Sequence, residues 1–256
     1  MRKHILTLLM VLALGAVPAF SNSLTIRIGY FFPEGKSDLW KIEFDQMSFT
    51  KSNYQSTAYG LDYELFLNKN FSLVLGFDTY VKNKAGYYRD YVGYEFPEGV
   101  FAFPLDYEGD FDLTHAFNVS ITPIQAGLKI TPLGRKSSFI PYLAAGATLT
   151  LWNVSLFGDM IDFSDVWIYE DPDYGDVDIY GVYPVSARQD TKIDLGYYLA
   201  GGFQYVVGNK ITLQAEVKYF WGKGTWSKAP LFEGFEDFEP FDLSSLYISL
   251  GLNYWF

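Results

Sequence analysis

The sequence predicts an all-β chain that folds as an eight-stranded antiparallel up-and-down transmembrane β-barrel. Apolar residues alternate with small or polar residues in eight separate stretches. The connections between these stretches alternate between short and long, and the chain ends inside the last stretch. Because successive side chains of a strand point to opposite faces of a sheet, each stretch has one apolar face and one small or polar face.

The first 21 residues are predicted to be a separate segment. Two basic residues precede an apolar run over residues 5–17, which is too short to span a membrane, and small residues follow. This order is typical of a secretory signal peptide, with cleavage after Ala19 or Ser21. An uncleaved anchor is the alternative, and the lack of a stop-transfer pattern disfavours it. We therefore expect residues 22–256 to form one barrel domain.

Eight stretches of alternation are long enough to be strands. They cover residues 24–30, 59–67, 71–78, 116–130, 143–151, 193–200, 211–219 and 246–256. In the fourth stretch the apolar parity changes at Thr122-Pro123. Proline cannot donate to a β-ladder and a β-bulge shifts parity by one residue, so we predict a bulge there.

The rhythm of the connections predicts which end of the barrel faces outward. Short connections are expected at 68–70, 131–138 and 208–210, and long ones at 33–53, 82–114, 153–190 and 222–243. Short periplasmic turns and four long extracellular loops are typical of outer-membrane barrels. A secreted lipocalin-like barrel or sandwich is the alternative, and it explains this rhythm less well. Aromatic residues at strand ends fit interfacial girdles, namely Tyr30, Phe31, Phe32, Tyr80, Trp152, Tyr219, Trp221, Tyr254 and Phe256.

The small or polar face is expected to line the lumen. A face in contact with water would carry many more Lys and Glu residues, whereas small residues with a few charges of both signs suit a narrow interior. Eight strands leave an interior that side chains just fill. We favour a paired network that plugs the lumen over a gate that opens a narrow pore. The charged residues on this face are Arg27, Asp62, Glu64, Asp78, Lys129, Asp194, Glu216 and Lys218.

Two segments resemble a known family. They are LYISLGLNYWF at 246–256 and TPIQAGLKITPLGRKSSFIPYLAAGATLTL at 122–151. Both are similar to the small eight-stranded outer-membrane barrels of Gram-negative-type bacteria, the group that contains OmpX, OmpW and the transmembrane domain of OmpA. The resemblance implies an outer-membrane location, with the lipid bilayer and lipopolysaccharide as partners. It also implies that the assembly machinery recognises Tyr254 and Phe256 in the last strand.

The sequence offers little for catalysis. The mature chain has a single histidine, His115, at the outer start of the fourth strand, near Asp112 and Thr114. A lone imidazole is no triad, so we favour an interfacial or loop-base histidine over a lipid-modifying enzyme. The chain has no cysteine and a net charge of −11, which argues against thiolate metal sites and nucleic acid. We expect no enzyme activity and no cofactor.

The long connections are acidic and rich in aromatic residues. Asp171, Asp173, Asp176 and Asp178 crowd together, but their order departs from an EF-hand loop, so a solvated loop is favoured over a Ca²⁺ site. Aromatic residues are enriched at binding surfaces, although these loops could equally pack on one another or extend the strands as β-ribbons. We expect an envelope structural or surface interaction protein with a possible extracellular protein or small-molecule ligand. An OmpW-like narrow channel for small apolar molecules is the alternative.

Overall fold

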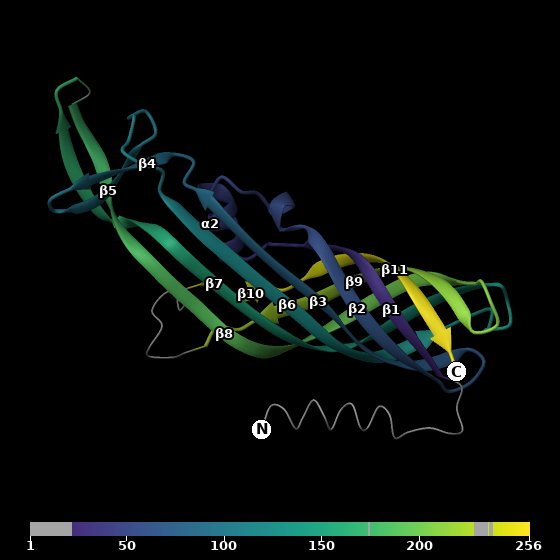
Figure 1. Cartoon of the computed structure of the whole chain (residues 1–256). Coiled ribbons are helices and arrows are strands. Elements are labelled where there is room, and N and C mark those ends of the chain that lie inside the picture. The colour runs from purple at the N-terminus through teal and green to yellow at the C-terminus, as the bar shows by residue number, and fades with distance from the viewer. Residues whose placement is uncertain (1–21, 174, 228–234, 236–237) are drawn as a thin grey trace.

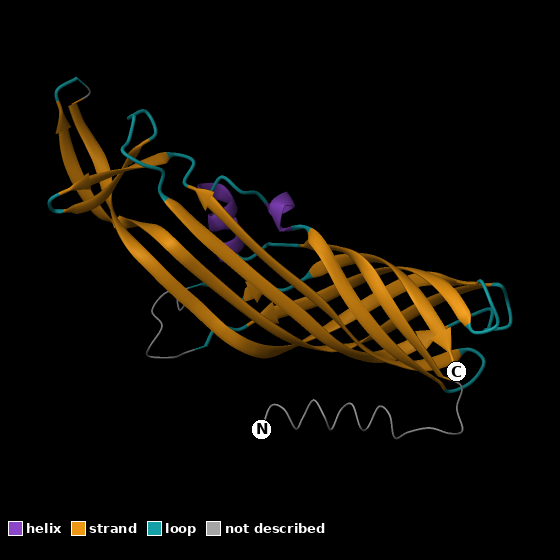
Figure 2. Ribbon diagram, viewed as in Figure 1, coloured by secondary structure: helices purple, strands orange, loops and turns teal. Residues whose placement is uncertain are grey.

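The computed structural model describes residues 22–173, 175–227, 235 and 238–256, so the predicted signal peptide lies outside the described residues. Eight strands close into an antiparallel barrel, which confirms the predicted fold class (Figures 1 and 2). In order around the wall they are β1 (Asn22–Pro33), β2 (Ser56–Phe66), β3 (Phe71–Tyr87), β6 (Thr114–Ile130), β7 (Phe139–Asp171), β8 (Gly175–Val206), β9 (Ile211–Gly224) and β11 (Ser245–Trp255). No helix among these described residues is long and apolar enough to cross a membrane.

The last strand closes the barrel against the first. β1 pairs with β11 from Ser23 opposite Trp255 to Pro33 opposite Ser245. The backbones of Asn22 and Phe256 add two more hydrogen bonds, of 3.2 and 3.0 Å. No strand edge therefore remains open along this seam, and its backbone polar groups are satisfied in the hydrocarbon. The start of β1 and the C-terminus lie at one end of the barrel, the periplasmic end (Figure 1).

The opposite, outer end carries additional structure. A helix and a 3₁₀ turn lie between β1 and β2, and a hairpin lies between β3 and β6. These elements are α2 (Asp38–Gln46), η1 (Lys51–Tyr54), β4 (Tyr91–Phe96), β5 (Gly99–Pro104) and the short β10 (Phe241–Asp242).

The β7–β8 hairpin continues far beyond the barrel (Figure 2). Here β8 also pairs with β5, from Val100 opposite Val182 to Ala102 opposite Tyr180. We call this projection, which comprises β4, β5 and residues 159–184, the arm. The predicted long connection over residues 153–190 is present, and most of it is ladder-paired strand, so it takes the form of the β-ribbon that the sequence left open.

The predicted bulge in β6 was also wrong. Pro123 lies opposite Thr150 within an unbroken register along β7, and the register with β3 is the same on both sides of the proline. Odd-numbered residues point inward along the whole strand. What changes near Thr122 is the polarity of the two faces. On the periplasmic side the outward residues are apolar, whereas on the outer side the inward ones are apolar, namely Phe117, Val119 and Ile121.

This reversal marks where β6 leaves the hydrocarbon. Inside the membrane the apolar face meets lipid, and beyond it the barrel follows the rule of a water-soluble protein, with its apolar side chains inside. The same boundary corrects the predicted girdle. Tyr30, Tyr254 and Phe256 do point outward, but Phe31, Tyr80 and Trp152 are buried inside the outer end.

The position of the boundary can be tested with two arginines on β3. Leu75 and Asn83 both point outward, but Leu75 lies within the apolar band and Asn83 lies beyond it. We expect Leu75→Arg to lower the free energy of unfolding by about 2–4 kcal/mol and Asn83→Arg by about 0–1 kcal/mol. Urea titration of the barrel refolded in vesicles measures both. Equal losses of unfolding free energy in the two variants would contradict a membrane boundary between Leu75 and Asn83.

Candidate functional site

Arg27 joins three other strands at the centre of the lumen. Its side chain projects inward from β1 and is only 1% exposed. The guanidinium contacts Asp62 of β2 at 2.8 Å, Asp78 of β3 at 2.9 Å and Glu216 of β9 at 2.5 Å. A planar guanidinium with several donors suits this branching, because Nη2 donates to both Asp62 and Asp78 while Nη1 donates to Glu216.

Further polar groups complete the coordination of these carboxylates. The Lys218 ammonium lies 3.0 Å from Asp78 and 3.2 Å from Glu216. The Tyr142 hydroxyl donates to Glu216 at 3.0 Å, and Gln125 Nε2 donates to Asp62 at 2.9 Å. The sequence analysis missed Tyr142 and Gln125, although both lie on the inward parity of their strands.

A second charge group lies on the periplasmic side of the first. Lys129 pairs with Glu64 at 2.8 Å, and Glu64 also accepts from Ser72 at 2.5 Å. Arg135 enters from the 131–138 turn, 3.4 Å from Glu64. The Lys129 ammonium lies 4.0 Å from the centre of the Tyr142 ring, which links the two groups. We call the four cations and four anions together the lumen cluster: Arg27, Lys129, Arg135, Lys218, Asp62, Glu64, Asp78 and Glu216.

Two glycines make room for the lumen cluster. A Cβ at Gly76 would lie 2.1 Å from the Asp62 carboxylate, and one at Gly60 would lie 2.2 Å from the Asp78 carboxylate. Both distances are far below van der Waals contact, so even alanine would displace a carboxylate from Arg27. Gly60 and Gly76 therefore leave the space that the carboxylates of Asp78 and Asp62 need in order to reach Arg27.

Asp194 does not join the lumen cluster, which corrects the predicted network. Its carboxylate lies nearer the outer end and accepts hydrogen bonds from the Trp152 indole at 2.7 Å and from the Thr225 hydroxyl at 2.8 Å. Parity placed this side chain inside the barrel but could not tell its height along the axis. The position of Asp194 along the barrel axis decides whether its carboxylate meets a cation or the Trp152 indole.

The lumen cluster leaves almost no free space. The cavity among Thr25, Gln125, Tyr198 and the ion pairs has a volume of about 10 Å³. This is about the space that one water molecule needs. At this level the interior is a packed polar core.

A second, aromatic layer closes the outer mouth. Trp40 of α2 is fully buried and stacks on Phe241, with ring centroids 5.1 Å apart. It also meets the rings of Tyr54 at 5.1 Å and Phe117 at 5.2 Å. The Tyr54 hydroxyl donates to the Phe117 carbonyl at 2.9 Å, which ties η1 to the wall. We call these four residues the mouth plug.

His115, the second residue of β6, lies beside this layer at the base of the preceding outer loop and is buried. Its Nε2 lies 2.8 Å from the Glu43 carboxylate of α2, and its Nδ1 lies 3.2 Å from the Asp159 carbonyl. The Tyr88 ring packs against it, and burial raises the pKa of Tyr88 to about 12. No sequence pattern pointed to Glu43 as the partner of His115, because the two residues are 72 positions apart in the chain.

The remaining predicted residues lie at the two ends. Asp171, Asp173, Asp176 and Asp178 surround the tip of the β7–β8 hairpin, where the Asp171 carboxylate accepts from the Asp173 backbone at 2.8 Å. The described part of the chain contains no group of three acidic or histidine side chains that could hold a metal ion. Tyr254 at the periplasmic end points outward from the wall.

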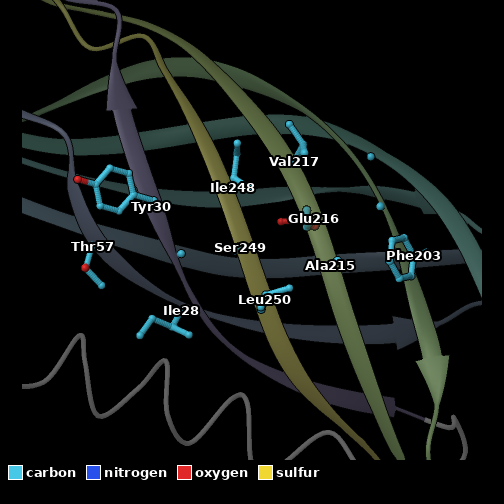
Figure 3. A pocket seen from close by; sticks show the side chains of 13 residues that line it. Ile28, Tyr30, Thr57, Phe203, Ala215, Glu216, Val217, Ile248, Ser249 and Leu250 are labelled. Carbon is cyan, nitrogen blue, oxygen red and sulfur yellow. The ribbon is translucent and has the colours of Figure 1, made fainter. Parts of the chain in front are cut away.

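A hollow lies on the outside of the wall (Figure 3). Its volume is about 530 Å³, and it spans β8, β9, β11 and β1. Most of the side chains that border it belong to the outward apolar faces, which are the faces that contact lipid in a membrane barrel. They include Ile28, Tyr30, Phe203, Val217, Ile248 and Leu250.

The lumen cluster predicts a large effect of removing its central cation. Arg27→Ala leaves Asp62, Asp78 and Glu216 buried without it, so we expect a loss of about 3–5 kcal/mol in the free energy of unfolding. Urea titration in vesicles measures the loss. Arg188→Ala is the matched control, because its ion pair with Asp190 is largely exposed, and it should leave the unfolding midpoint unchanged. Equal midpoints for both variants would contradict a central role for Arg27.

The chain is similar, at low sequence identity, to solved outer-membrane proteins. OprG from Pseudomonas aeruginosa is 12% identical and covers 93% of this chain and 96% of its own, with a TM-score of 0.47. Ail of Yersinia pestis, solved with a heparin analogue, is also 12% identical and covers 93% and 100%, with a TM-score of 0.43. No curated protein matches the chain. The family model described as "Outer membrane protein beta-barrel domain" matches residues 6–256, so the chain belongs to the outer-membrane β-barrel family and lies in the outer membrane.

Proposed function

We propose that this barrel conducts nothing through its lumen and works by its outer surface, as an envelope structural or interaction protein without enzyme activity. The observation that carries the proposal is closure at two levels. The lumen cluster fills the membrane-embedded part, and the mouth plug covers the outer end. The alternative, a narrow channel for small apolar molecules, has less support, because the wall at membrane level is lined by paired charges.

The arm supplies the surface for such a role. Residues 159–184 contain eight acidic residues and no basic one. Between these charges, Trp167 and Tyr183 are about half exposed and Ile168 is more exposed still. Exposed apolar side chains within a strongly charged field are typical of interaction sites. We infer that the partner is a positively charged protein surface that also offers apolar side chains.

The membrane supplies the other proposed partners. The outward apolar faces contact the bilayer and the acyl chains of lipopolysaccharide. We infer that Tyr254 and Phe256 are read by the assembly machinery before the barrel closes. Their rings lie 6.2 Å apart on the outward face of the wall, where a partner could contact them. In the finished barrel the same rings lie at the lipid interface.

Planar-bilayer recording tests the closed lumen. We expect the refolded mature barrel to be electrically silent, with a heat-dependent gel shift showing that it is folded. Arg27→Ala should increase leakage, because it opens the centre of the lumen cluster. Stable conductance of the native chain that changes in Glu216→Gln would overturn the proposal and favour transport.

Binding of a cationic amphipathic peptide to barrel-containing vesicles tests the arm. Replacing Asp171, Asp173, Asp176 and Asp178 by asparagine should weaken binding by about tenfold or more, mainly at low salt. Trp167→Ser with Ile168→Ser removes the apolar contact and should weaken binding at both low and high salt. Asp45→Asn, on an exposed position of α2 outside the arm, is the single-charge control and should leave the affinity unchanged. Unchanged peptide affinity in both the four-aspartate variant and the Trp167–Ile168 variant would exclude the arm as the binding surface.

A further inference from the structure

The periplasmic end of the barrel carries a charge opposite to that of the whole chain. The three periplasmic turns, residues 67–70, 131–138 and 207–210, contain four basic residues and no acidic one, in a chain with a net charge of −11. The basic residues are Lys69, Arg135, Lys136 and Lys210. We call these three turns the basic rim. The proposed function does not use its charges.

Hydrogen bonds between neighbouring segments make the basic rim one continuous surface. The Thr131 backbone N–H, in the second turn, donates to the Asn70 carbonyl of the first turn at 2.8 Å. The Val206 N–H, directly before the third turn, donates to the Ser138 carbonyl of the second at 2.9 Å. The turns therefore lie side by side around the end of the barrel that holds the C-terminus (Figure 2).

Three of the four cations are free to meet an anion from outside the protein. The ion pairs at this end join Glu64 to Lys129 and to Arg135, which reaches into the lumen. Lys69, Lys136 and Lys210 are exposed, and within the described residues no carboxylate, including the one at the C-terminus, forms an ion pair with them.

Aromatic side chains place the basic rim at the level of the lipid headgroups. Phe71 and Phe139 directly follow the first and second turns, and Tyr205 lies two residues before the third. All three point outward and are about half exposed, as in the aromatic girdle of a membrane barrel. The Lys210 ammonium lies 5.8 Å from the centre of the outward Tyr254 ring. A cation of the rim therefore lies directly at this girdle.

Each turn of the basic rim also exposes one large apolar side chain. Leu67 is 50% exposed, Leu133 is 65% exposed and Val207 is 52% exposed. Apolar side chains beside cations suit the surface of a bilayer, where both the acyl region and the anionic headgroups are within reach. A purely water-soluble anion would leave these three side chains without a contact.

We propose that the basic rim binds the phosphate groups of anionic phospholipids in the periplasmic leaflet of the membrane. The three free ammonium groups attract the headgroups, and the apolar side chains of the turns contact the lipid below them. Basic residues close to an anionic bilayer surface each add to such attraction, and salt weakens it. The barrel thus gathers anionic lipid around its periplasmic end.

The lipid selectivity of the refolded mature barrel tests this proposal. Spin-labelled phosphatidylglycerol or phosphatidylcholine, at trace level in phosphatidylcholine vesicles, reports its association with the barrel through the immobilised part of its EPR spectrum. We expect phosphatidylglycerol to be favoured by about threefold or more at low salt, and most of this preference to be lost at about 1 M salt. Lys69→Gln with Lys136→Gln and Lys210→Gln should abolish it.

Two further variants separate charge at the rim from charge elsewhere. Lys36→Gln with Lys41→Gln and Lys51→Gln removes the same number of exposed lysines from the segment between β1 and β2 at the outer end, and the preference should remain. Replacing the three rim lysines by arginine keeps their charge and should keep the preference. The heat-dependent gel shift shows that each variant has folded.

Several outcomes would overturn the proposal. Equal association of both labelled lipids with the native barrel would do so, and it would favour a water-soluble anionic partner in the periplasm. A preference that survives in the rim glutamine variant, or that falls equally in the outer control, would also contradict it. Loss of the preference when inorganic phosphate replaces chloride at equal ionic strength would assign the rim to free phosphate instead of lipid.

Discussion

The hydrocarbon of the membrane imposes the constraint on which the rest of this structure depends. A strand edge exposed there would leave backbone groups without partners, so the sheet must close on itself. The β1–β11 seam achieves this closure with the first and last residues of the described barrel. Closure with eight strands then fixes a lumen so narrow that its inward side chains must contact one another. The sizes and charges of the inward residues must therefore be compatible with contact across the lumen.

The narrow lumen explains why its charges are balanced and cross-linked. A buried charge without a partner is costly, and a buried ion pair contributes to specificity more reliably than to stability. Arg27 meets carboxylates from three strands that are far apart in sequence, so a shifted register would separate them. Gly60 and Gly76 show that the wall itself is shaped for these pairs. We infer that the lumen cluster selects the correct register as well as filling the interior.

The barrel obeys two opposite rules along its axis. In the membrane its apolar side chains face out, and beyond the membrane they face in, around Trp40 and Phe117. The outer part of the barrel is thus packed like a water-soluble protein, with aromatic side chains in its interior. The proposed function assigns a task to each part: the inner part anchors and seals the barrel, and the arm contacts partners.

Alternation along each strand was enough to determine the all-β class, the eight strands and, within the membrane, the inward faces, because period-two patterning is a local property. The sequence alone could not determine height along the barrel axis, because height depends on the register between strands. It therefore grouped Asp194 with Arg27 and read the polarity reversal at Thr122 as a bulge. Only the tertiary structure brought Glu43 to His115, since burial under a folded loop joins residues that share no local pattern.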